Sequence, residues 1–143
     1  MRISFDMDDT LVPRGRDSAE AVLLNGDRLR KGALPLLREL AQEHELWIYT
    51  TSYRNPWYLR FSFWLKGVRI RKVVNEAEHQ RMIRKYGFDV QPSKYPKHYG
   101  IDLHVDDSRG VLEEGRQFGF RVIQIDLDDD GWVDKVRTAI HLA

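Results

Sequence analysis

Short apolar runs and amphipathic segments alternate along this chain, which predicts strands and helices in turn. The runs of strand length are residues 2–6, 46–49, 70–74, 101–105 and 121–125. Helical spacing of apolar residues occupies the intervals 32–41, 55–66, 76–86, 109–118 and 132–142. Alternation of this kind is typical of βαβ units, whose right-handed crossovers place helices on both faces of a parallel sheet. The pattern therefore predicts an α/β fold, a Rossmann-like three-layer sandwich around a mostly parallel sheet.

Length and composition limit what this fold can be. The 143 residues suit a single domain, and no apolar run approaches the roughly 18 residues that cross a bilayer. The first strand begins so close to the N-terminus that we expect no signal peptide. Because the chain has no cysteine, disulfides, thiol catalysis and thiolate metal sites are excluded, and we expect a cytoplasmic protein.

The net charge of +1 conceals an uneven distribution of charge. Residues 53–100 hold 11 basic and 3 acidic side chains, whereas residues 101–143 hold 5 basic and 10 acidic ones. A basic block attracts anionic substrates, although solvated helix faces explain most of these residues equally well. The basic block is compatible with a polyanion such as nucleic acid but does not require one.

Polar side chains follow every predicted strand. They are Asp6, Asp8, Asp9 and Thr10, then Thr50, Thr51 and Ser52, then Asn75, then Asp106, Asp107 and Ser108, and finally Asp126. The carboxyl ends of parallel strands meet at one edge of a sheet, where ligands bind. A single aspartate there is as well explained by a cap or turn, but converging carboxylates repel each other unless a cation lies among them. Oxygen ligands without His or Cys favour a hard ion, and the sequence thus predicts a Mg²⁺ site.

The segment Asp6-Met7-Asp8 places two carboxylates two residues apart, directly after a buried strand. Both side chains point the same way if the chain remains extended. One carboxylate can attack phosphorus to form an aspartyl-phosphate, and the other can move a proton to the leaving oxygen and later from a water molecule. A metal ion and positioned donors must then neutralise the phosphoryl charge.

These residues resemble the haloacid dehalogenase (HAD) superfamily of phosphatases and phosphotransferases. The segment Ile3–Leu11 matches its first motif, an apolar run followed by Asp-x-Asp-x-Thr-Leu. Leu46–Thr50 matches the second, an apolar strand that ends in Thr or Ser, and Leu103–Asp107 matches the fourth, a strand followed by paired acids. The motifs span nearly the whole chain, so the resemblance implies a HAD-like fold for residues 1–143.

The resemblance also implies roles for individual residues. Asp6 becomes the nucleophile and Asp8 the general acid/base. The expected Mg²⁺ ligands are the Asp6 carboxylate, the Asp8 backbone carbonyl, Asp106, and Asp107 directly or through water. Thr10 orients the Asp8 region, and Thr50 binds the phosphoryl group, with its neighbour Thr51 as the alternative.

The third motif is a lysine that precedes the fourth, and two residues fit it. We favour Lys94, because Ser93-Lys94-Tyr95-Pro96 is typical of an anchored turn, whereas Lys97 lies where the chain enters the next strand. Lys97 remains the alternative for contact with substrate. Arg54, four residues after Thr50, is within reach of a substrate phosphate, although a surface residue at a helix start explains it as well.

The short segment between the first strand and the first helix limits the size of any cap over the site. HAD-like enzymes often carry a cap domain, but here Leu11–Lys31 leaves room only for a hairpin or flap. We therefore expect an open site without a substantial cap that accepts a bulky phosphorylated substrate, or that a neighbouring subunit covers. Five aromatic residues between Trp57 and Trp64 offer a stacking surface, but packing in the core is the expectation for most of them.

The sequence thus favours a magnesium-dependent phosphomonoester hydrolase. A dehalogenase also uses an aspartate nucleophile, but it leaves Asp8 and the Asp106-Asp107 pair without a role. A non-catalytic phosphate-binding or interaction module on the same fold is the alternative from another class.

Overall fold

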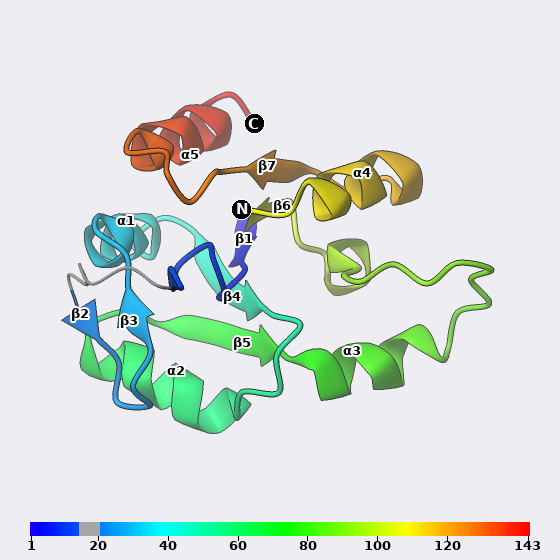
Figure 1. Ribbon diagram of the computed structural model, residues 1–143, viewed down its shortest axis with the longest axis horizontal. Coiled ribbons are helices and arrows are strands. Elements are labelled where there is room, and N and C mark those ends of the chain that lie inside the picture. Colours follow the sequence, from blue (N-terminus) through cyan, green and yellow to red (C-terminus); the bar gives the residue numbers. More distant parts are fainter. Residues whose placement is uncertain (15–20) are drawn as a thin grey trace.

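The computed structural model describes residues 1–14 and 21–143, and its centre is a five-stranded parallel sheet (Figure 1). The strands lie in the order β5-β4-β1-β6-β7, and every neighbouring pair is parallel. Their bounds are Arg2–Phe5 (β1), Glu45–Tyr49 (β4), Ile70–Val74 (β5), Leu103–Asp106 (β6) and Val122–Gln124 (β7). The predicted α/β fold is confirmed.

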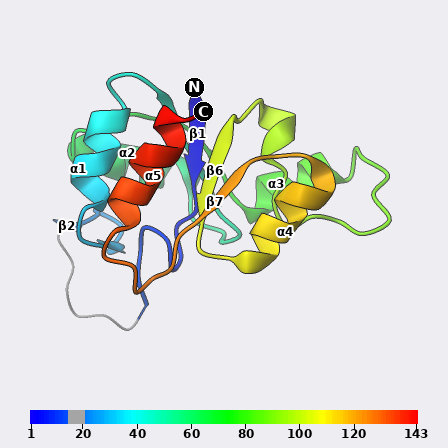
Figure 2. The same ribbon diagram turned by 90° about the horizontal axis from the view of Figure 1, so that it is seen from above.

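Helices cover both faces of this sheet. They are α1 (Ala33–Leu40), α2 (Pro56–Leu65), α3 (Glu76–Ile83), α4 (Arg109–Phe118) and α5 (Trp132–His141). Seen from above, α1, α2 and α5 lie on one side of the strands and α3 and α4 on the other (Figure 2). None of the helices in residues 1–14 and 21–143 is long and apolar enough to cross a bilayer.

The strand order determines where a ligand can bind. β1 lies between β4 and β6, so the chain moves outward on one side of β1 first and returns to build the other side later. The crossovers on the two sides carry helices on opposite faces, and this leaves a crevice at the carboxyl end of β1. Apolar side chains fill the middle of the sheet, since Ile3, Phe5 and Val105 are fully buried. The polar residues that follow these strands are thereby held on a rigid support.

The segment between β1 and α1 contains a small antiparallel hairpin. Its strands are β2 (Ala21–Val22) and β3 (Arg28–Leu29), in the part of the chain where the sequence left room for a hairpin or flap. Figure 1 shows it beside α2. Tyr58 of α2 donates a hydrogen bond from its hydroxyl to the carbonyl of Leu24 in the hairpin turn, at 3.2 Å.

Some predicted boundaries shift in the structure. The helix predicted over 76–86 ends at Ile83, and turns follow it. The strand predicted over 101–105 is displaced to Leu103–Asp106, because a 3₁₀-helix, η1 (Pro96–Tyr99), occupies the preceding loop. Gly100 ends η1 with a left-handed backbone (φ 66°), which delays entry into the strand.

Core packing was the wrong expectation for most aromatic residues of α2. The buried face of this helix consists of Leu59, Ser62 and Phe63. Trp57 and Trp64 lie on the solvent side and expose 78% and 65% of their surface. One helix face against the sheet accommodates only a narrow stripe of side chains, and the remaining rings are left outside.

Candidate active site

Asp6 lies at the carboxyl end of β1, where the backbone turns sharply. The amides of Leu11 and Val12 both donate to the carbonyl of Met7, at 3.0 and 2.9 Å. Asp9 adopts a left-handed conformation (φ 61°), which few residues other than glycine, asparagine and aspartate tolerate. The turn folds the chain back over the end of β1, so that Asp6 is 6% exposed and held in one orientation.

Thr10 links the first and fourth motifs. Its hydroxyl Oγ1 lies 3.0 Å from Oδ2 of Asp6 and 3.1 Å from Oδ1 of Asp107, and it accepts a hydrogen bond of 3.0 Å from the backbone amide of Asp107. The single hydroxyl proton serves one carboxylate at a time. Thr10 is fully buried, and its contacts fix the spacing between two carboxylates that repel each other.

Lys94 lies between two aspartates in the interior. Its ammonium Nζ is 2.8 Å from Oδ1 of Asp6 and 2.5 Å from Oδ2 of Asp106, and the side chain is 2% exposed. Burial lowers the pKa of Lys94, but the charges of the two aspartates outweigh this effect and raise it, so the ammonium remains charged. The structure thus places Lys94, the lysine favoured from the sequence, beside Asp6.

The loop that carries Lys94 is fixed on both sides of this residue. Upstream, the carbonyl of Pro92 accepts a hydrogen bond of 2.9 Å from Nε2 of His79, and downstream the amide of Tyr95 donates to the hydroxyl of Tyr49 at 2.9 Å. The Tyr49 hydroxyl lies 2.6 Å from Nδ1 of His79, to which it donates. The pair of Tyr49 and His79 therefore clamps the loop from within the fold.

Glu114 of α4 supports the same loop from outside. Its carboxylate accepts hydrogen bonds from the amide and the hydroxyl of Ser93, each at 2.9 Å to Oε2. Residues 92–95 are thus anchored by three side chains, Tyr49 of β4, His79 of α3 and Glu114 of α4. Such support keeps the ammonium at a fixed position, which electrostatic stabilisation of a reacting group requires.

Asp106 has a second buried partner in His104. Nε2 of His104 lies 2.8 Å from Oδ2 of Asp106, and Nδ1 lies 2.7 Å from the Ser4 hydroxyl. A carboxylate only accepts hydrogen bonds, so Nε2 donates, and Nδ1 accepts from Ser4. Burial lowers the pKa of His104, which keeps the ring neutral. Burial also raises the pKa of Asp106, but the hydrogen bond from His104 and the charge of Lys94 bring it below its usual range.

The pKa of Asp107 shifts in the opposite direction to that of Asp106. Partial burial and the negative charges of Asp106 and Asp6 raise the pKa of Asp107 to about 6. Lys94 contacts Asp6 and Asp106, whereas Asp107 has the Thr10 hydroxyl and the Asp6 carboxylate beside it. One ammonium for three carboxylates leaves an excess of negative charge.

This excess and the donor set fit a divalent cation. Asp6, Asp106 and Asp107 each offer one carboxylate oxygen, and these oxygens lie within 4.8 Å of one another. The set contains neither His nor Cys, and such oxygen ligands suit Mg²⁺ or Ca²⁺. A cation here would relieve the repulsion that raises the pKa of Asp107.

Thr50 begins the loop after β4. It is 1% exposed, and its hydroxyl Oγ1 lies 2.9 Å from that of Ser52 and accepts a hydrogen bond of 3.1 Å from the Ser52 amide. Thr51 is exposed and lines a separate hollow with His79 and Ser93. Of the two threonines, Thr50 is the one held inside the fold.

Arg54 holds Asp8 at the entrance of the site. Its guanidinium donates to both oxygens of Asp8, at 2.9 and 3.1 Å, and to both oxygens of Asp27 from the hairpin turn, at 2.8 and 3.0 Å. The hydrogen bond from Arg54 lowers the pKa of Asp8, and Asp8 and Asp27 together keep Arg54 charged by raising its pKa. Arg54 is therefore not a free surface residue, since its side chain is 17% exposed.

Several residues named from the sequence lie outside this cluster. Lys97 is exposed in η1 and lies close to Gly119 at the end of α4. Asp9 pairs with Arg14 at 3.7 Å, and Asp126 is exposed. Asn75 caps α3 through the amide of Glu78.

Sequence reasoning missed several supporting residues. The link between His104 and Asp106 was not foreseen. The signal was present, because side chains two residues apart in a strand point to the same face. For Asp27 and Glu114 no local pattern indicated a partner, since their contacts with Arg54 and Ser93 join distant parts of the chain.

Comparison with solved structures finds similar folds. The fold is similar to a predicted HAD-like family hydrolase from Porphyromonas gingivalis, with a TM-score of 0.51 and 13% sequence identity over 96% of this chain and 97% of that chain. It is also similar to the D,D-heptose 1.7-bisphosphate phosphatase from B. bronchiseptica, solved in complex with magnesium and phosphate, with a TM-score of 0.55 and 14% identity over 96% and 98% of the two chains.

No protein-family model and no curated protein sequence matches this chain. At these low identities the two structures establish the fold, and the resemblance found in the sequence is confirmed at that level.

Proposed function

We propose that this chain, which has the fold of the HAD-like hydrolases, is a magnesium-dependent phosphomonoester hydrolase with Asp6 as its nucleophile. The observation that carries the proposal is the position of Lys94, whose ammonium contacts Asp6 and Asp106 at the carboxyl edge of the sheet. A buried lysine that contacts two strand-end carboxylates, with a third close by, has little use in packing. It suits a site that must bring a carboxylate nucleophile close to a phosphoryl group.

The first step transfers the phosphoryl group to Asp6. A carboxylate oxygen of Asp6 forms a bond to phosphorus while the bond from phosphorus to the leaving oxygen breaks, and Asp8 gives its proton to that oxygen. In this proposal Lys94 and the Thr50 hydroxyl bind the phosphoryl oxygens, on which negative charge increases. Since Arg54 pairs with Asp8 before substrate is present, Asp8 must leave Arg54 to carry this proton.

The second step releases phosphate. Water attacks the phosphorus of the aspartyl-phosphate, the bond to the Asp6 oxygen breaks, and Asp8 accepts the proton of the water. Asp6 is then free again as a carboxylate, and Asp8 is protonated for the next substrate. The Thr10 hydroxyl, which accepts a hydrogen bond from the amide of Asp107, lies beside Asp6 and can donate to its carboxylate.

Mg²⁺ is the proposed cofactor, held by Asp6, Asp106, Asp107 and the backbone carbonyl of Asp8. When bound, it supplies positive charge that neutralises the phosphoryl group and allows a carboxylate to approach it. The support for this proposal is the set of three carboxylates with one ammonium, together with the magnesium in the similar heptose bisphosphate phosphatase.

The proposed enzyme is a single domain without a substantial cap. The segment between β1 and α1 that the structure describes holds only the short hairpin of β2 and β3. An open site of this kind admits a bulky phosphorylated substrate.

The test is hydrolysis of p-nitrophenyl phosphate with and without Mg²⁺ by the wild type and Asp6→Asn. We expect release of p-nitrophenol that requires the metal and is lost in the variant. Asp126→Asn, which removes an exposed strand-end carboxylate outside the cluster, is the matched control and should retain activity. Unchanged activity in Asp6→Asn would contradict the mechanism, and chloride release from a haloacid without metal would favour a dehalogenase instead.

A further inference from the structure

Helix α2 exposes a row of aromatic rings to solvent. Trp57, Phe61 and Trp64 are spaced by four and three residues, which places them along one side of the helix, and they are 78%, 47% and 65% exposed. Large apolar side chains grouped on a surface in this way mark an interaction site more often than scattered ones do. We call Trp57, Phe61 and Trp64 the aromatic row.

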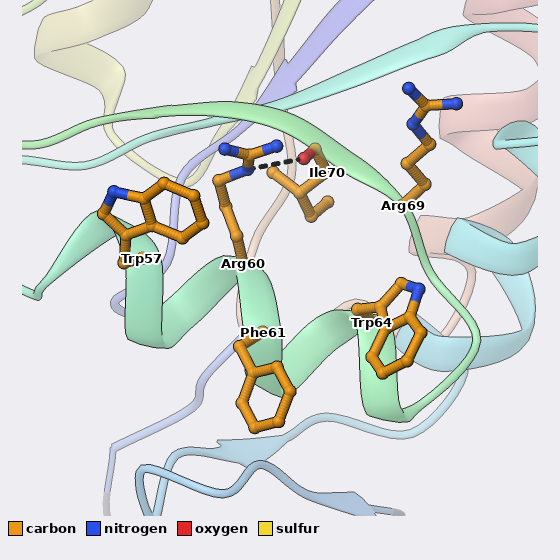
Figure 3. A pocket seen from close by; sticks show the side chains of 6 residues that line it. All are labelled: Trp57, Arg60, Phe61, Trp64, Arg69 and Ile70. Atoms are coloured by element: carbon orange, nitrogen blue, oxygen red, sulfur yellow. Dashed lines mark hydrogen bonds between the residues drawn. The ribbon is translucent and has the colours of Figure 1, made fainter.

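The aromatic row borders a hollow of about 400 Å³ between α2 and the start of β5. Its lining residues are Trp57, Arg60, Phe61, Trp64, Arg69 and Ile70 (Figure 3). Arg60 donates from Nε to the carbonyl of Ile70 at 3.0 Å, and its guanidinium carbon lies 5.5 Å from the centre of the Trp57 ring. The hydrogen bond holds the cation at a fixed place beside the ring.

The charge of this hollow is positive. Two of the six lining residues are arginines and none is acidic, and neither arginine has a carboxylate partner within residues 1–14 and 21–143. On β5, the edge strand of the sheet, Arg71 and Lys72 pair with Glu45 and Glu78 at 3.2 and 2.7 Å, so the positive charge of the hollow comes from Arg60 and Arg69. Flat apolar rings next to guanidinium groups that have no carboxylate partner in the described part of the chain complement a ligand with planar rings and negative charge.

We propose that the aromatic row and its two arginines bind single-stranded nucleic acid. Bases stack on the exposed rings, and backbone phosphates contact Arg60 and Arg69. Trp57 and Trp64 are seven residues apart in a helix and therefore about 10 Å apart along its axis. This separation exceeds the size of one base, so the surface fits a strand better than a free nucleotide.

Two other occupants fit the observations less well. A second copy of this chain, docked through the same surface by two-fold symmetry, would bring the arginines of both copies together in a hollow that holds no acid. An anionic membrane surface attracts a cluster of several cations, whereas this hollow is lined by two arginines, and the neighbouring Arg71 and Lys72 are paired with Glu45 and Glu78. The proposed partner is therefore a nucleic acid strand.

The test measures the fluorescence anisotropy of a labelled oligothymidylate of about 12 nucleotides, a length within the usual site size of single-strand binders. We expect binding that weakens with salt and does not require Mg²⁺. Trp57→Leu/Trp64→Leu keeps apolar side chains but removes the stacking rings, and it should weaken binding about tenfold or more. Arg60→Gln/Arg69→Gln should weaken binding and reduce its dependence on salt.

The control variant is Arg116→Gln/Arg121→Gln, which removes two exposed cations near β7 at the opposite edge of the sheet. It should bind as the wild type does. The proposal fails if the wild type does not bind the strand, or if the leucine variant binds equally well. It also fails if light scattering shows a dimer that the leucine variant dissociates, or if the protein instead sediments with anionic vesicles. None of these readouts depends on hydrolysis of a phosphate ester.

Discussion

Arg54 forms two hydrogen bonds to Asp8, one to each carboxylate oxygen, at 2.9 and 3.1 Å. The same guanidinium holds Asp27 of the hairpin, so Arg54 ties the proposed general acid to the β2–β3 hairpin. This pairing favours the ionised form of Asp8. Loss of this pairing should therefore favour the protonated form of Asp8.

Replacement of Arg54 should change both the rate of hydrolysis and its pH dependence. In Arg54→Gln the pKa of Asp8 should rise from its lowered value, because its largest stabilising contact is gone. The limb of the kcat/KM profile that reports loss of the Asp8 proton should then move to higher pH. We also expect kcat/KM at neutral pH to fall about tenfold or more, since Asp8 and Asp27 no longer share a cation that orients them.

Arg54→Lys distinguishes charge from geometry. An ammonium group keeps the positive charge but cannot form paired hydrogen bonds with two carboxylates at once. We expect the pH profile to stay near that of the wild type while kcat/KM falls. A profile of Arg54→Gln that does not move would show that Arg54 has no influence on Asp8 during the reaction.

Mutation can decide which of the two candidate lysines, Lys94 or Lys97, acts in the proposed reaction. Lys94→Met should reduce kcat by about 10² or more, because the phosphoryl group loses a positioned cation. It should also lower Tm, since removal of one partner from a buried ion pair costs roughly 3–5 kcal/mol. Lys97→Met, in an exposed position of η1, is the matched control and should change neither quantity. Equal losses in both variants would contradict the assignment of Lys94.

The elevated pKa of Asp107 predicts how pH and Mg²⁺ act together on stability. The folded pKa of about 6 lies above the unfolded value of 3.8, so the folded state holds its proton more tightly. Without metal, the contribution of Asp107 to stability is therefore present below about pH 4 and is lost as pH rises through about 6.

Added Mg²⁺ should reverse this loss. A cation binds the ionised carboxylate, so the increase in Tm on addition of Mg²⁺ should be small at pH 5 and larger at pH 7.5. Asp107→Asn should be less sensitive to pH over the same range. An increase in Tm that is equal at both pH values would show that Asp107 does not take part in metal binding.

Local patterns in the sequence were sufficient to predict the fold and the polar residues that follow its strands. The buried run Ile3–Phe5 and the polar residues after it predicted both β1 and the position of Asp6, because burial and strand spacing are properties of neighbouring residues. The fold is confirmed, whereas the roles of Asp6, Asp8 and Thr50 remain predictions that the geometry supports.

What the sequence did not reveal depends on contacts between distant segments. Arg54 was as well explained as a helix-start residue because its partner Asp27 lies 27 positions earlier, in a hairpin without a distinctive pattern. The aromatic residues of α2 were expected in the core because their spacing is helical, but spacing does not show which side of a helix faces the sheet. Leu59 and Phe63 take that side, and Trp57 is left in solvent.

His104 gives the last prediction, because it supports a proposed metal ligand without being one. Its Nε2 donates to Asp106 at 2.8 Å and its Nδ1 accepts from Ser4, both within the interior. Hydrogen bonds of this kind orient a ligating carboxylate, and their loss typically weakens metal binding 10- to 100-fold. We expect His104→Ala to raise the concentration of Mg²⁺ needed for half-maximal hydrolysis by roughly that factor.

A purely structural role for His104 would give a different result. In that case His104→Ala would lower Tm but leave the dependence on Mg²⁺ unchanged in the molecules that remain folded. His104→Gln, which retains an N–H donor, should recover part of the affinity for Mg²⁺, whereas His98→Ala, at an exposed position of η1, should not affect it. The experiment titrates the activity of these three variants with Mg²⁺ and measures their Tm values. It therefore shows whether His104 orients Asp106 for metal binding or only stabilises the core.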